Sequence, residues 1–205
     1  MLSSLPSLEQ AENYLVEAGH LNPGPWAPHS RYVAKAARAI ALHHPRLDPD
    51  CAYIMGCLHD IGRRFGVCGM RHVLDGYRFL TGEGYERVGR ICLTHAYPLS
   101  GELAGASPWD GSQEELGFVR DYLAGIEYDD YDKLIQLCDA IALPTGFCLM
   151  EKRLVEVAMR YGVDKYTPKR WQAYFAVKSE IEQAIGVSVY GLLPGAIENT
   201  FRSDV

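Results

Sequence analysis

Two aspartates lie in stretches of sequence where a carboxylate needs a partner. Asp139 sits inside residues 134–143, an almost wholly apolar run with helical spacing. An unpaired carboxylate buried there would be costly or would take up a proton. His59 and Asp60 follow a second apolar run, and His95 ends a third. A divalent cation would satisfy these residues together, because neutral imidazole and carboxylate are its natural ligands.

Each of these residues has a simpler explanation when it is taken alone. A His-Asp dipeptide can arise by chance in a chain of this composition. His95 alone could be an ordinary histidine at a helix end, and Asp139 alone could pair with an arginine. The joint pattern is more specific, since each position falls on its own predicted helix. In chain order it reads His29, His59-Asp60, His72, His95 and Asp139.

The elements that must position these residues are predicted to be helices, and the fold class is all-α. Capping boxes at Ser7/Gln10 and Ser112/Glu115 open two of the helices, and Asp48-Pro49 opens another. The chain shows no internal repeat and no clear domain boundary. Apolar spacing and breakers predict helices near residues 7–19, 28–44, 49 to either 62 or 66, 70–81, 85–95, 113–124, 130–142, 148–161 and 168–185, with a short one after Pro194.

At these residues the sequence resembles the HD-domain phosphohydrolases in their HDIG form. The stretch Cys57-Leu-His-Asp-Ile-Gly-Arg63 looks like the family signature, His29 like its opening histidine and Asp139 like its closing aspartate. His72 and His95 look like the two further histidines of the dinuclear branch. The resemblance covers about residues 25–145. It implies a single HD-domain helical bundle over residues 1–205, with residues 146–205 as a C-terminal helical extension.

The resemblance also implies a metal arrangement and a reaction. His29, His59, Asp60 and Asp139 would hold a first metal, and Asp60 would bridge to a second metal held by His72 and His95. We expect two divalent ions, with iron or manganese preferred and zinc, cobalt, nickel or magnesium also able to bind. A metal-activated hydroxide would then cleave a phosphate ester or anhydride of a small molecule, with a nucleotide as the leading candidate.

Arginine and lysine side chains near these motifs could bind the phosphate. Arg63 follows the HDIG motif, where relatives often carry a basic residue, so it is the first candidate for a phosphate clamp or for a residue that supports a ligand. Arg64, Arg71 and Lys133 are further candidates, each equally well explained as a solvated surface residue. Asp75 either orients His72 or is simply exposed.

Two other functions remain open on the same ligand set. The superfamily includes di-iron oxygenases that use O₂, and nothing in the ligand pattern separates them from hydrolases. A non-catalytic metal-binding or sensing module is the third interpretation. Oxygen consumption would distinguish the oxygenase, whereas a hydrolase should work anaerobically with manganese.

The amino-acid composition limits the kinds of binding partner that we expect. A net charge of −6 argues against binding a nucleic-acid polymer, which needs a basic face, but allows a small phosphorylated substrate. The N-terminus lacks the features of a signal peptide and no apolar run is long enough to cross a membrane, so we expect a cytoplasmic protein that does not bind membranes.

The 6 cysteines show no CxxC spacing, which disfavours zinc fingers and disulfides. A homodimer remains open, and the irregular residues 100–112 could form a lid.

Overall fold

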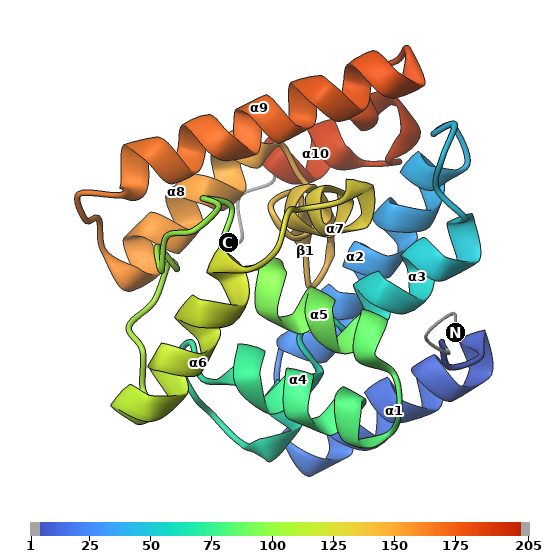
Figure 1. The fold of residues 1–205 in the computed structure, drawn as a ribbon. Coiled ribbons are helices and arrows are strands. Elements are labelled where there is room, and N and C mark those ends of the chain that lie inside the picture. Colours follow the sequence, from blue (N-terminus) through green and yellow to red (C-terminus); the bar gives the residue numbers. More distant parts are fainter. Residues whose placement is uncertain (1–4, 202–205) are drawn as a thin grey trace.

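Helices make up almost all of the regular structure in the computed structural model, which describes residues 5–201. The predicted all-α class is therefore confirmed (Figure 1). The elements in chain order are α1 (Leu8–Leu21), α2 (Trp26–Ala41), α3 (Pro49–Leu58), the 3₁₀ helix η1 (Ile61–Phe65), α4 (His72–Gly82), α5 (Glu86–Thr94), α6 (Gln113–Ala124), α7 (Asp130–Asp139), strands β1 (Ala142–Leu143) and β2 (Gly146–Phe147), α8 (Met150–Tyr161), α9 (Thr167–Ile185), the 3₁₀ helix η2 (Val189–Leu192) and α10 (Ala196–Phe201).

Local capping explains where several helices begin. The Ser7 hydroxyl accepts a hydrogen bond from the Gln10 N–H at 3.1 Å, and the Gln10 side chain accepts one from the Ser7 N–H at 2.8 Å. Ser112 and Glu115 form the same reciprocal pair at the start of α6. These contacts satisfy backbone donors that the first helical turn leaves without partners.

Of the helix ends that differ from the sequence prediction, two lie at the site. The helix predicted to run to residue 62 or 66 ends at Leu58, and a 3₁₀ turn follows His59 and Asp60. The helix predicted over 130–142 ends at Asp139, because Ala142 pairs with Phe147 in the β1–β2 hairpin. The chain reverses there, so an apolar run that would suit a longer helix is divided between a helix and a strand.

One hydrophobic cluster joins the middle of the chain to its C-terminal helices. Buried side chains of α2, α3 and α7 pack there with side chains of α9, η2 and α10, and α7 and α9 are in contact. Figure 1 shows α9 along one edge of the bundle, with α1 and α4 at the opposite edge. The cluster includes Val33, Ile40, Met55, Leu134, Ile135, Val177, Ile181, Val189, Leu193 and Ala196.

Glycine allows η1 to lie directly against the start of α4. A Cβ at Gly62 would come within 2.0 Å of the His72 carbonyl oxygen and 2.4 Å of the Gly76 nitrogen, which no larger residue could tolerate without moving the backbone. Gly62 therefore brings the segment after Asp60 close to His72. None of the helices between residues 5 and 201 is long and apolar enough to span a membrane.

Candidate metal centre

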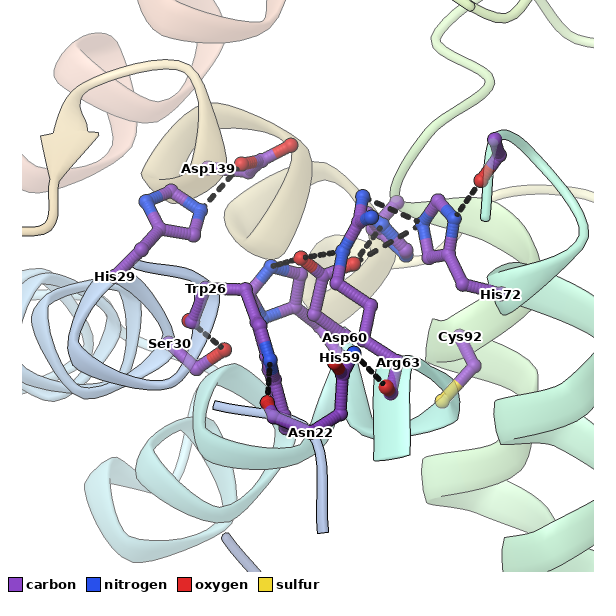
Figure 2. Close-up of polar contacts among 12 residues, drawn as sticks. Asn22, Trp26, His29, Ser30, His59, Asp60, Arg63, His72, Cys92 and Asp139 are labelled. Carbon is purple, nitrogen blue, oxygen red and sulfur yellow. Dashed lines mark hydrogen bonds and ion pairs between the residues drawn. The ribbon is translucent and has the colours of Figure 1, made fainter. Parts of the chain in front are cut away.

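The structure brings together all the residues that the sequence pattern singled out as metal ligands. Figure 2 shows His29, His59, Asp60, His72 and Asp139 directed toward a common space. They come from helix ends: the first turn of α2, the link between α3 and η1, the start of α4, the residue after α5 (His95) and the last residue of α7. The four histidines and Asp60 are buried, each at most 6% exposed, whereas the Asp139 side chain is 25% exposed.

Short distances connect these side chains around Asp60. Its Oδ1 lies 3.0 Å from Nε2 of His72 and 3.6 Å from Nε2 of His95. Its Oδ2 lies 3.9 Å from Nε2 of His59. On the far side of His59, Nε2 of His29 donates a hydrogen bond to Oδ1 of Asp139 at 2.8 Å. One carboxylate is thus shared by three imidazoles, and the second carboxylate pairs with the fourth.

Backbone carbonyls determine which nitrogen of three imidazoles faces the centre. Nδ1 of His59 donates to the Gly56 carbonyl at 2.8 Å, Nδ1 of His72 to the Gly69 carbonyl at 2.6 Å, and Nδ1 of His95 to the Ile91 carbonyl at 3.1 Å. A carbonyl oxygen can only accept, so in the neutral ring the proton is on Nδ1 and Nε2 carries a lone pair; that of His72 lies 3.4 Å from Nη2 of Arg63. This is the arrangement of a metal-binding histidine with its outer hydrogen bond in place.

Two overlapping groups of side chains could each hold an ion. They are His29, His59 and Asp139, and His59, Asp60 and His95, with ligand atoms within 4.8 Å of one another. His59 Nε2 and Asp60 Oδ1 are buried without a hydrogen-bond partner among the described residues. Buried polar atoms are rarely left unsatisfied, and both of these atoms offer lone pairs rather than protons. The residues present therefore fit a cation between them.

The protonation states of His59, Asp60 and Asp139 favour metal binding. Burial lowers the pKa of His59 to about 4, which keeps the ring neutral. Burial alone would raise the pKa of Asp60, but the charges of Arg63 and His72 hold it well below its usual range. Burial is likewise outweighed at Asp139, where the hydrogen bond from His29 lowers the pKa of the carboxyl group. His95 differs, because Asp60 outweighs burial and raises its pKa.

Of the basic residues proposed as phosphate contacts, only Arg63 lies at the centre. Its Nε donates to Oδ2 of Asp60 at 2.7 Å, and its side chain lines the adjoining cavity. The other candidates pair elsewhere and do not line that cavity: Arg64 with Glu17, Arg71 with Asp75 and Glu115, and Lys133 with Glu180. Asp75 thus contacts Arg71, and His72 is oriented by Gly69 instead.

A cavity of about 380 Å³ opens onto the centre, and its far wall comes from the C-terminal helices. A volume of this size suits a small-molecule ligand. The sequence does not predict this wall, because arginines and aromatics on an amphipathic helix do not indicate which face of the helix meets a site. The side chains that α8 and α9 contribute include Arg153, Arg160, Tyr161, Arg170, Trp171 and Tyr174.

The irregular segment 100–112 supports the loop that orients His72. The Asp110 carboxylate accepts hydrogen bonds from the N–H groups of Gly69 at 2.6 Å and Arg71 at 2.8 Å. The Gly69 carbonyl, in turn, accepts from Nδ1 of His72. Asp110 therefore helps to position His72 without touching it. The hypothesis of a lid stays a prediction, although Ala106 and Ser107 of this segment do line the cavity.

We expect Asp110→Ala to weaken metal binding at the His72 side of the centre by at least about tenfold, the usual effect of losing an outer hydrogen bond that holds a ligand. The measurement is the manganese content per chain at limiting manganese. Asp121→Ala is the control, because Asp121 is exposed on α6 and its carboxylate, within residues 5–201, pairs only with its neighbour Arg120. Equal manganese content in the two variants would refute the role of Asp110.

A buried polar network sets the spacing between α5 and α7. Nε of Arg90 donates to Oδ1 of Asp132 at 3.2 Å, and the Thr94 hydroxyl donates to the same oxygen at 2.7 Å. Gln136 donates from Nε2 to the Thr94 carbonyl at 3.0 Å. Since Thr94 precedes His95, this network holds the His95 end of α5 against the helix that ends at Asp139.

We expect Asp132→Asn to lower the free energy of unfolding by about 3 kcal/mol, because it leaves the Arg90 charge without its buried partner. Asp132 is fully buried and the Arg90 side chain only 24% exposed, so solvent screens the pair weakly. Urea denaturation measures the change. Asp121→Asn, at a side chain 74% exposed, should change it by less than about 0.5 kcal/mol. Similar losses in both variants would contradict the assignment.

Comparison with known proteins gives one match. The family model described as HD domain matches residues 26–143. No curated protein and no solved structure matches the chain. The matched segment contains every candidate metal ligand and ends before α8, so the far wall of the cavity lies outside it.

Proposed function

The chain belongs to the HD-domain family, and from this we propose that it is a metal-dependent phosphohydrolase that cleaves a phosphate ester or anhydride of a small molecule. The observation that carries the proposal is the cluster of buried imidazoles and carboxylates with unpartnered lone pairs, facing a cavity that arginines line. The unpartnered lone pairs are suited to bind metal cations, and the guanidinium groups are suited to bind an anionic ligand. Hydrolysis of a phosphate ester by a metal-dependent enzyme needs both a metal cation and a site for the anionic phosphate.

We further propose two metal ions. His29, His59, Asp60 and Asp139 would hold one, and Asp60, His72 and His95 the other. The shared position of Asp60, with one oxygen toward each set, supports this division. Neutral imidazole with carboxylate suits iron or manganese, and zinc, cobalt, nickel or magnesium are compatible. When bound, such ions supply Lewis acidity, which lowers the pKa of water and offsets charge that develops at phosphorus.

The chain's own residues would orient the substrate and keep the ligands in their binding state. Asp60 stays ionised because Arg63 contacts it, and the Arg63 side chain can still present donors to the cavity that it lines. The carbonyls of Gly56, Gly69 and Ile91 hold the histidines in one tautomer. Histidines held in this way would act as fixed ligands.

We propose a nucleotide as the substrate, because the cavity offers aromatic as well as cationic walls. Trp26, Tyr161, Trp171 and Tyr174 line it together with arginines. Aromatic faces suit a nucleobase, and guanidinium groups suit phosphate oxygens. Tyr32 and Tyr77 do not line this cavity: Tyr32 packs against Phe147, and Tyr77 against Phe118 and Tyr122.

The test is a hydrolysis assay on the full chain after reconstitution with manganese. We expect anaerobic release of orthophosphate from members of a panel of nucleotides and sugar phosphates. A protein loaded with iron that consumes O₂ but releases no phosphate would refute the hydrolase and indicate the oxygenase. Metal uptake with neither reaction, across the whole panel, would indicate a binding or sensing module.

A further inference from the structure

Arg153 is an almost enclosed arginine that faces the candidate metal centre from outside the HD segment. It lies on α8, lines the same cavity as Asp60 and Asp139, and its side chain is 15% exposed. Its Nη2 lies 4.0 Å from Oδ1 of Asp139, which is an ion-pair distance but too long for a hydrogen bond. That oxygen already accepts the hydrogen bond from His29.

Within residues 5–201, the Arg153 guanidinium donates no hydrogen bond to another residue. The other arginines of the cavity differ in this respect. Arg63 donates to Asp60, and Arg170 donates to Asp164 at 3.1 Å and to Thr167 at 2.9 Å. Arg160 is exposed, so water can serve its donors. The Arg153 side chain is mostly buried, and its guanidinium N–H groups have no acceptor among the described residues. A guanidinium group in such a position needs an acceptor from within the cavity.

The local charges point to an anion as that acceptor. Asp139 is the nearest carboxylate to Arg153 and, under the proposed function, it is committed to a metal ion. Tyr174 of α9 adds a neutral donor to the same wall, because burial and then the charge of Asp139 raise the pKa of its hydroxyl group. Within the described part of the chain, this hydroxyl group also has no hydrogen-bond partner. The wall therefore offers donors close to Asp139, and its other carboxylate, Glu156, lies 4.0 Å from the Lys152 ammonium group.

We propose that Arg153 binds the phosphoryl group of the substrate at the Asp139 end of the centre, opposite Arg63 at the Asp60 end. The planar guanidinium fork matches two phosphate oxygens, as a lysine ammonium does not. The C-terminal helices then complete the active site that the HD segment begins. This inference rests on the proposed function, since it assigns Arg153 to the phosphate that reacts.

The test is calorimetric titration of the manganese-loaded full chain with inorganic orthophosphate. We expect R153Q to bind orthophosphate at least about tenfold more weakly than the wild type, the size expected for a charge-assisted hydrogen bond. R153K should recover part of the loss. Manganese content should stay at the wild-type value in both variants. The matched control is R120Q, because Arg120 is exposed on α6 and pairs with Asp121, and it should leave binding unchanged.

Either of two results would overturn the proposal. R153Q could bind orthophosphate as tightly as the wild type, or it could lose manganese, in which case Arg153 supports Asp139 and does not contact phosphate. Should R153Q fail to fold, R153K decides, with at least about threefold weaker binding expected. The readout does not depend on turnover. Binding through Arg153 without hydrolysis would refute only the proposed function, and hydrolysis with unaltered binding by R153Q would refute only this inference.

Discussion

Asp60→Asn is expected to lower kcat/KM for phosphate release at least about 10³-fold, which corresponds to about 4 kcal/mol of transition-state stabilisation. Asp60 is the side chain that three imidazoles and Arg63 share. An asparagine keeps the size but replaces one oxygen with an NH₂ group, which cannot donate a lone pair to a cation. The variant should therefore contain less metal per chain, and the measurement pairs elemental analysis with the phosphate-release assay.

The control for this prediction separates loss of the site from loss of the fold. Asp121→Asn removes an exposed carboxylate on α6 and should retain full activity and metal content. Circular dichroism of Asp60→Asn should match the wild type, because the packing of α3 against α2 does not involve this carboxylate. Wild-type turnover and metal content in Asp60→Asn would show that Asp60 is not a ligand.

Much of the centre could be predicted from sequence because its residues conflict with their local surroundings. Asp139 lies within an apolar run, and His59 and Asp60 follow another one at residues 53–58. Such side chains are stable there only with a cationic partner, and this requirement can be inferred from the sequence alone. The capping boxes at Ser7 and Ser112 were equally visible, because their partners lie three residues away. Features of this kind depend only on residues that are close together in the sequence, so they can be predicted without a structure.

What could not be predicted depends on contacts between distant segments. The end of α7 at Asp139 results from a hairpin whose second strand follows it, and periodicity alone extends the helix. The Asp110 carboxylate accepts a hydrogen bond from the N–H of Gly69, which lies 41 residues away in the sequence, and no residue near Asp110 indicates that contact. Arg153 looks like any solvated arginine of an amphipathic helix. Only the packing of α8 and α9 over the centre turns it inward.

The location of the ligands at helix ends has a physical consequence for this centre. Ligands on separate helices depend on the packing between those helices, which here includes the Arg90–Asp132 network and the close contact at Gly62. The two proposed cations, with Asp60 shared between them, would link α2, α3, α4, α5 and α7. Metal binding should therefore be measurable as stability of the whole fold, and not only as activity.

Removal of metal with a chelator is expected to abolish phosphate release and to lower Tm by about 5–10 °C. A ligand present at about 100 times its Kd stabilises the folded state by about 2.7 kcal/mol, and each kcal/mol corresponds to about 2–4 °C in a chain of this size. The physical reason is the buried pair His59 Nε2 and Asp60 Oδ1, which have no hydrogen-bond partner among residues 5–201 without a cation. Scanning fluorimetry before and after dialysis measures the shift, and added manganese should reverse both effects.

His59→Ala provides the decisive comparison for this prediction. It removes a ligand of the first proposed ion, which also belongs to both groups of side chains that could hold a metal, so the chelator should lower its Tm by less than it lowers the wild-type Tm. His43→Gln is the matched control, because His43 is exposed at the end of α2, away from the cavity, and its Tm should respond as the wild type does. A chelator that leaves the wild-type Tm unchanged, or that shifts His59→Ala just as far, would mean that the buried lone pairs around Asp60 are not satisfied by a metal.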